Sequence, residues 1–273
     1  MFYSSKKEHI PCLRKSKRLE KGSETMPKAV MFDCYNTLLR YLSKEDKEGI
    51  WEMLITAISY LTRKEITVTP EELEDIYLQS CQKVEKKCIK EYGIHAETNY
   101  TEVWYYVLMK MGISRKKARE KAEDILLLHR IYAREKKHLF PNVERELLAL
   151  KKQGIKLALL SNAQTCFVRH ELPQEIWRLF DAAVVSQEVN LKKPSKEVFR
   201  MLFDELEVDP KDVVFVGDSA SDDMIPSGEL GCYSVMIVKD LQKDTSLSHV
   251  IPFSPYKKDG YAGFADLIMN IKD

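Results

Sequence analysis

The sequence predicts an α/β fold in which a doubly wound parallel sheet carries an inserted all-helical domain. A short apolar segment at 28–33 has the length and composition of a buried strand. After Pro141, short apolar runs alternate with amphipathic helical patterns, which is typical of a parallel sheet covered on both faces. Between these two parts, from 42 to 138, the pattern is helical. We therefore expect this block to lie outside the sheet.

The expected elements follow in chain order. The first strand lies at 28–33, and the inserted block then contributes helices at 46–64, 70–92, 98–112 and 114–136. Thr69 before Pro70 is a good helix start, because threonine caps free backbone N–H groups and proline suits the first helical position. The second part contributes a helix at 142–153, a strand at 155–160, a helical stretch at 165–179, a strand at 182–185, a helix at 196–207, and strands at 213–216 and 233–238.

These patterns divide the chain into three parts. Residues 1–27 are basic and lack the apolar run of a secretory signal, so we expect a disordered tail with no function of its own. Residues 28–41 and 139–273 form the expected α/β core. Residues 42–138 form the expected helical domain, which we call the cap.

Composition limits the class of protein. A hydrophobic content of 44% in 273 residues suits a packed core, and 31% charged residues suit a soluble surface. The net charge of +1 gives no general attraction to nucleic acid or membranes, and no apolar run approaches the ~18 residues of a membrane span. Six scattered cysteines without a CxxC pair indicate reduced thiols and a cytoplasmic location. We expect a small-molecule substrate and a monomer or homodimer.

Polar side chains stand at the ends of several expected strands or in the loops that follow them. They are Asp33, Ser161, Asn162, Lys193, and Asp218, Asp222 and Asp223 in the run "VGDSASDDM". Each is weak evidence alone, because Ser-Asn after a strand is usually a helix cap and Lys-Pro is usually a solvated helix entry. The carboxyl ends of parallel strands meet at one edge of a sheet, where ligands bind. We therefore expect these side chains to form one site.

Four segments resemble the motifs of the haloacid dehalogenase (HAD) superfamily of hydrolases, most of which are phosphatases. "FDCYNTLL" is similar to the first motif, DxDGTL, apart from its tyrosine and asparagine, and "ALLSNA" resembles the second. "NLKKPSKEVF" resembles the stretch that carries the motif-three lysine, and "VGDSASDDMIPSGELG" resembles the fourth motif. The resemblance covers 29–40 and 139–238, and the cap has the position and character of the family's first-type cap.

The resemblance implies a Mg²⁺-dependent phosphatase that hydrolyses a small phosphorylated metabolite. Asp33 would attack phosphorus and form an aspartyl-phosphate, which divides the hydrolysis into two easier steps. The implied catalytic residues are Asp33, Tyr35, Ser161, Asn162 and Lys193. The implied ligands of the hard cation, which prefers oxygen, are Asp33, Asp218, Asp223 and the backbone carbonyl of Tyr35, with Asp222 the weaker choice. The implied phosphate-binding residues are Ser161, Asn162 and Lys193.

Tyr35 departs from the family's phosphatases. In those enzymes an acid at this position protonates the leaving oxygen and later activates water. A tyrosine with its usual pKa of about 10 is a poor acid–base group at neutral pH. The same tyrosine is typical of the family's 2-haloacid dehalogenases, in which the aspartate attacks carbon and the halide needs no proton.

Dehalogenation is therefore the alternative, and three features oppose it. Those dehalogenases need no metal and resemble "SSN" where this chain has "GDS", and they have a tyrosine where this chain has Phe199. Asp218 beside Asp33 without a cation would also raise a carboxyl pKa and weaken the nucleophile. A third possibility is a weakly active relative that serves as a binding or regulatory protein.

Overall fold

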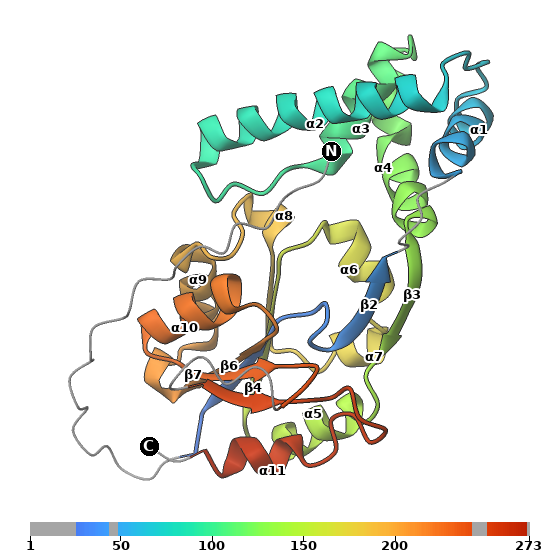
Figure 1. The fold of residues 1–273 in the computed structure, drawn as a ribbon. Coiled ribbons are helices and arrows are strands. Elements are labelled where there is room, and N and C mark those ends of the chain that lie inside the picture. The colour runs from blue at the N-terminus through green and yellow to red at the C-terminus, as the bar shows by residue number, and fades with distance from the viewer. Residues whose placement is uncertain (1–25, 44–48, 242–249, 272–273) are drawn as a thin grey trace.

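The computed structural model describes residues 26–43, 49–241 and 250–271 (Figure 1). Its core is a six-stranded parallel sheet with the strand order β5-β4-β1-β6-β7-β8. The strands are β1 (Ala29–Phe32), β4 (Lys156–Ser161), β5 (Ala182–Val185), β6 (Val213–Gly217), β7 (Tyr233–Ile237) and β8 (Val250–Phe253). The order reverses between β1 and β6, which is the switch point at which such sheets bind ligands. The predicted fold class is confirmed.

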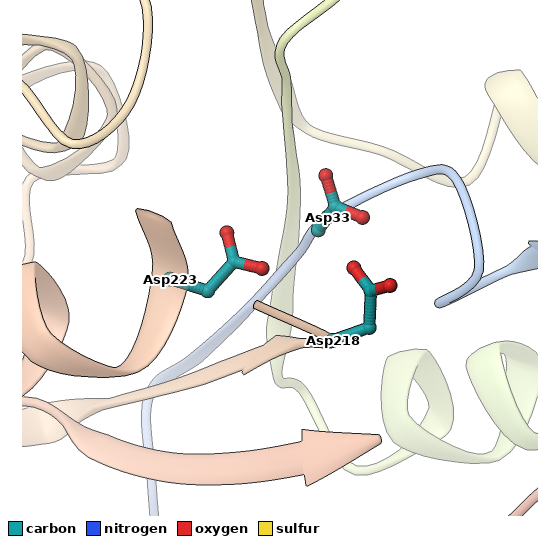
Figure 2. Close-up of side chains that lie close together, drawn as sticks. All are labelled: Asp33, Asp218 and Asp223. Carbon is teal, nitrogen blue, oxygen red and sulfur yellow. The ribbon is translucent and has the colours of Figure 1, made fainter. Parts of the chain in front are cut away.

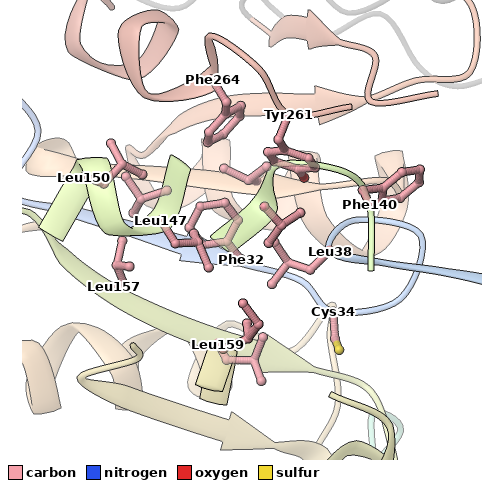
Figure 3. Close-up of a cluster of buried hydrophobic side chains, with 14 of the residues drawn as sticks. Phe32, Cys34, Leu38, Phe140, Leu147, Leu150, Leu157, Leu159, Tyr261 and Phe264 are labelled. Carbon is pink, nitrogen blue, oxygen red and sulfur yellow. The ribbon is translucent and has the colours of Figure 1, made fainter. Parts of the chain in front are cut away.

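Helices cover both faces of the sheet. They are α5 (Val143–Lys152), α6 (Thr165–Glu171), α7 (Gln174–Trp177), α8 (Ser186–Val189), α9 (Lys196–Leu206), α10 (Ile225–Leu230) and α11 (Phe264–Met269). Successive side chains of β1 point to opposite faces, so Val30 and Phe32 pack with α5 and α11 while Ala29 and Met31 pack with α9. Figure 3 shows the first of these clusters around Phe32. Because both faces are buried, β1 is apolar at every position up to Asp33.

The cap is a helical domain with a hydrophobic core of its own. Its helices are α1 (Ile50–Thr62), α2 (Pro70–Tyr92), α3 (Tyr100–Lys110) and α4 (Arg115–Tyr132). Their apolar faces meet around the fully buried Trp104. Helix α2 begins with a capping box, in which Thr69 and Glu72 each satisfy a backbone N–H of the other.

The last cap helix is shorter than expected. The helix predicted at 114–136 ends at Tyr132, and this part of the prediction was wrong. The chain continues as β3 (Arg134–Leu139), which pairs in antiparallel fashion with β2 (Leu39–Ser43). This pairing joins segments that are far apart in the sequence, so no local pattern indicates it. The resulting two-stranded ribbon carries both connections between cap and core (Figure 1).

Other differences are local. The helical stretch expected at 165–179 is divided into α6 and α7 at Pro173, which precedes α7 and has no N–H for a continuous helix. Strand β8 and helix α11 were not predicted. The start of the helix expected at 46–64, and all but the last two residues of the tail expected at 1–27, lie outside the described residues. None of the described helices is long and apolar enough to cross a membrane.

Candidate active site

Three carboxylates meet at the switch point of the sheet. Asp33 follows β1, Asp218 follows the neighbouring strand β6, and Asp223 lies in a single π-helical turn at Ala220–Met224. One carboxylate oxygen from each of the three lies within 4.8 Å of the others. Figure 2 shows the three side chains converging from these elements. Asp222 is not part of this group.

The backbone around Asp223 is shaped to hold its carboxylate. Gly217 has no side chain, and a Cβ at this position would collide with the Asp223 carboxylate. The Ser219 N–H donates to Asp223 Oδ2 at 3.0 Å, and Ser219 Oγ accepts from the Asp222 N–H at 3.1 Å. The glycine in "VGDS" therefore allows Asp223 to approach the end of β6.

Lys193 is buried between two of the carboxylates. Its Nζ donates to Asp33 Oδ1 at 2.6 Å and forms an ion pair with Asp223 Oδ1 at 2.7 Å. Only 3% of the lysine side chain is exposed. Burial by itself would lower the pKa of Lys193, but the charges of Asp33 and Asp223 outweigh burial and raise it. Lys193 is therefore a fixed positive charge beside Asp33.

One lysine does not balance three acids. Burial raises the pKa of Asp218 to about 7, with further contributions from the charges of Asp33 and Asp223. Burial also raises the pKa of Asp33, although the Lys193 charge opposes this. Clustered carboxylates resist simultaneous ionisation unless a cation joins them. Oxygen donors of this kind are the ligands that Mg²⁺ prefers, so the residues present fit a divalent cation.

Strand β4 ends at Ser161, and the next residue, Asn162, contacts Lys193. The Asn162 side-chain amide binds the Lys193 backbone twice, accepting from its N–H at 2.8 Å and donating to its carbonyl at 3.1 Å. Asn162 therefore positions the lysine, and its contact with phosphate stays a prediction. The Ser161 hydroxyl is fully buried without a hydrogen-bond partner among the described residues, and so is that of Thr37. Buried hydroxyl groups are normally paired, so both suit a ligand.

Tyr35 points its hydroxyl toward the interface of cap and core. Its ring lies 5.1 Å from the Arg130 guanidinium, and its hydroxyl is buried without a hydrogen-bond partner among the described residues. Burial, together with the nearby Glu171, raises the pKa of Tyr35 well above its usual value. The hydroxyl therefore stays protonated across the physiological range. The side chain that replaces the expected acid is part of a contact between domains.

A cavity of about 300 Å³ lies between the cap and the core next to these groups. Its wall consists of Tyr35, Tyr41, Glu97, Tyr100, Arg130, Asn162, Ala163, Gln164 and Phe167. Three of these wall residues matter to the site although no motif marks them. Glu97, Arg130 and Gln164 all lie outside the four motif segments. Only their long-range contacts reveal them.

The sequence matches the family of haloacid dehalogenase-like hydrolases over residues 27–226. Glyceraldehyde 3-phosphate phosphatase of Methanocaldococcus jannaschii is 28% identical over 134 residues, which cover 49% of this chain and 58% of that protein. Phosphoglycolate phosphatase of Vibrio cholerae is 33% identical over 98 residues, covering 36% and 43%. Phosphoserine phosphatase of Thermus thermophilus is 28% identical over 143 residues, covering 52% and 55%. The chain thus spans about half the length of the curated relatives it matches.

Solved structures show the same fold over nearly the whole chain. A 2-haloacid dehalogenase of Pseudomonas syringae superposes with a TM-score of 0.62 and 19% identity, covering 89% of this chain and 98% of that one. A HAD phosphatase of Thermococcus onnurineus superposes with a TM-score of 0.55 and 18% identity, covering 88% and 97%. The two neighbours are named for different reactions, so the likeness establishes the fold alone.

Proposed function

The chain belongs to the haloacid dehalogenase-like hydrolases, and from this premise we propose that it is a Mg²⁺-dependent phosphatase of a small phosphorylated metabolite. The observation that carries the proposal is the convergence of Asp33, Asp218 and Asp223 within 4.8 Å, with the Lys193 ammonium between two of them. Such a cluster suits a divalent cation and a doubly negative phosphoryl group. The cavity of about 300 Å³ beside it suits a small leaving group.

In the proposed reaction Asp33 is the nucleophile. Its carboxylate oxygen forms a bond to phosphorus as the bond from phosphorus to the leaving oxygen breaks, which gives an aspartyl-phosphate. Water then attacks phosphorus and the bond from phosphorus to the Asp33 oxygen breaks, which releases inorganic phosphate and regenerates the free carboxylate. Lys193 donates to Asp33 Oδ1 and so orients the carboxylate and favours its ionised form.

The other groups hold the phosphoryl group and the cation. Ser161 and Thr37 have buried hydroxyl groups that can donate to phosphoryl oxygens. Asp33, Asp218 and Asp223 would hold Mg²⁺, together with the backbone carbonyl of Tyr35. The cation, when bound, draws negative charge away from the transferring phosphoryl group.

Dehalogenation on carbon is the second candidate, and Tyr35 is the observation that favours it. A departing halide needs no proton, and the Tyr35 hydroxyl is a poor proton donor because its pKa is raised. The carboxylate cluster favours the phosphatase, since Asp218 and Asp223 would have no role in attack on carbon. The names of the curated relatives also favour the phosphatase over the dehalogenase, because the relatives described above are phosphatases.

A two-product assay separates the candidates. Purified protein is incubated with small phosphate monoesters and with 2-chloropropionate, each in Mg²⁺ or in EDTA. The proposal expects phosphate release that EDTA abolishes and no halide release. Halide release that persists in EDTA would establish the dehalogenase instead. The cytoplasmic location and the monomeric or homodimeric state remain predictions.

A further inference from the structure

Glu97 belongs to the cap but is tied to the core beside the active site. It lies in the segment between α2 and α3, and its N–H donates to the Asn190 carbonyl at 3.0 Å. Two residues earlier in this segment, the His95 carbonyl accepts from the Lys192 N–H at 2.9 Å. The core segment of this pairing, in which Leu191 forms an isolated β-bridge with Ala96, leads directly into Lys193. The position of Glu97 is therefore fixed relative to the cluster that contains Asp33.

The Glu97 side chain is a buried acid in the wall of the cavity. Only 8% of Glu97 is exposed. Its Oε2 accepts from the Ser186 hydroxyl at 2.7 Å, and its Oε1 accepts from the Gln164 side-chain amide at 3.2 Å. Both donors are neutral, and no ion pair joins Glu97 to a cation within the part of the chain that the structure describes. Burial raises the pKa of Glu97, while the Lys192 charge opposes this only in part.

The cation in the same wall does not neutralise this acid. The Arg130 guanidinium donates to both oxygens of Glu171, each at 3.1 Å. Arg130 and Glu171 thus cancel each other, and the Glu97 carboxylate adds a negative charge at the cavity that Lys192 compensates only in part. A buried carboxylate without a cation is costly. A positively charged ligand group would remove this cost, which a neutral or negative group would not.

We propose that Glu97 binds an ammonium group of the substrate, so that the enzyme acts on phosphate monoesters of small amino alcohols. This inference rests on the proposed phosphatase function and names the substrate class of that site. The phosphoryl group would lie at Asp33 and Lys193, and the ammonium group would enter the cavity. The ring of Tyr100 in its wall also suits a cation.

A substrate of this class also depends less on a general acid, which Tyr35 does not supply efficiently. An ammonium group two carbons from the ester oxygen withdraws electron density from that oxygen. The oxygen therefore departs more readily as an anion, which takes its proton from solvent after the bond to phosphorus has broken. An enzyme without an efficient general acid gains from such a substrate.

The test compares esters of matched length that differ in the charge of one end. They are 2-aminoethyl phosphate, propyl phosphate and phosphoglycolate, which carry an ammonium, a methyl and a carboxylate group. Turnover by the natural protein is measured with saturating Mg²⁺, and binding is measured by calorimetry on Asp33→Asn. We expect kcat/KM for the ammonium ester to exceed that for propyl phosphate at least about tenfold, since a buried charge pair contributes on the order of 1.4 kcal/mol or more. Phosphoglycolate should be the poorest of the three.

A substitution of Glu97 tests whether this residue causes the preference for the ammonium ester. Glu97→Gln should raise KM for 2-aminoethyl phosphate about tenfold or more while changing KM for propyl phosphate less than about threefold. Glu120→Gln, which removes the same charge from an exposed position on α4, should change neither value. The comparison of esters by the natural protein does not depend on whether Glu97→Gln folds.

Turnover of p-nitrophenyl phosphate distinguishes a failure of the role proposed for Glu97 from a failure of the proposed phosphatase function. If this ester is hydrolysed in Mg²⁺ while the ammonium and methyl esters are used equally, or phosphoglycolate is preferred, the role of Glu97 is overturned and the phosphatase function stands. If no ester is hydrolysed or bound, both are overturned.

Discussion

Arg130 of cap helix α4 and Glu171 of core helix α6 are joined by two parallel hydrogen bonds, each 3.1 Å long. The guanidinium also lies 4.1 Å from the ring of Tyr41 and 4.7 Å from that of Phe167. Burial would raise the pKa of Glu171, but the hydrogen bonds and charge of Arg130 outweigh it and lower the pKa. This pair fixes the cap against the core next to Tyr35, whose ring lies 5.1 Å from the guanidinium.

Arg130→Met should destabilise the protein because it leaves the Glu171 carboxylate buried beside an apolar side chain. We expect a loss of about 2–4 kcal/mol, somewhat below the usual cost of breaking a fully buried pair because 19% of the Arg130 side chain is exposed. Urea unfolding of both proteins measures it. Arg169→Met breaks the exposed pair with Glu188 and should cost less than about 1 kcal/mol. Equal losses in the two variants would contradict the role assigned to Arg130.

Tyr35→Asp should change the dependence of turnover on the leaving group. In the natural protein, aryl phosphates should be hydrolysed much faster than alkyl phosphates without an activating group, because the Tyr35 hydroxyl donates a proton poorly. A carboxyl group at this position should raise turnover of alkyl phosphates more than that of aryl phosphates. A series of esters at saturating Mg²⁺ measures this slope.

Tyr35→Phe serves as the control, because it keeps the ring beside Arg130 and removes only the hydroxyl. It should change kcat less than about threefold, far less than the 10²–10⁴ attributed to general acid catalysis. A flat series for the natural protein, or a large loss in Tyr35→Phe, would show that the hydroxyl acts in the chemistry.

Gly217→Ala should impair the site without unfolding the core. The added Cβ would collide with the Asp223 carboxylate and displace it from Lys193 and the other acids. We expect activity to fall by about 10²-fold, as displacements near 1 Å cost in other active sites. Gly228→Ala is the matched control, since nothing lies within 4 Å of the Cβ it would add. Comparable activity of the two variants would mean that Asp223 is not required where the structure places it.

Mg²⁺ should stabilise the protein more at pH 8 than at pH 5. The pKa of Asp218 is raised to about 7 and that of Asp33 is also raised, whereas the unfolded chain has carboxyl pKa values near 3.9. Without metal the folded state therefore holds protons more tightly, and stability is lost as pH rises through the folded pKa. Thermal unfolding in EDTA should show this loss.

Saturating Mg²⁺ should offset the loss, adding about 2.7 kcal/mol at a hundredfold excess over its Kd. Asp218→Asn should reduce both the loss of stability with rising pH in EDTA and the stabilisation by Mg²⁺. A stabilisation by Mg²⁺ that is equal at the two pH values, or greater at pH 5, would be the contrary result.

Local patterns predicted most of the sheet, because its strands are apolar at nearly every position and its helices are amphipathic. That Asp33 and Asp218 lie at one edge of the sheet was also expected from the sequence, since both follow strands of the parallel sheet, whereas the adjacency of β1 and β6 is known only from the structure. The pairing of β2 with β3 could not be predicted, because each strand is stabilised by a partner distant in the sequence. Glu97 was not found for a related reason. Its hydrogen-bond donors are Gln164 and Ser186, which belong to the core rather than the cap.

The most direct test of the central claim measures phosphate release by the natural protein and by Asp33→Asn, each in saturating Mg²⁺ and in EDTA. An amide cannot act as the nucleophile, although it retains nearly the volume of the carboxylate. The account predicts release by the natural protein in Mg²⁺ alone, and none above background from Asp33→Asn under either condition. Release that persists in EDTA, or that survives Asp33→Asn, would contradict it.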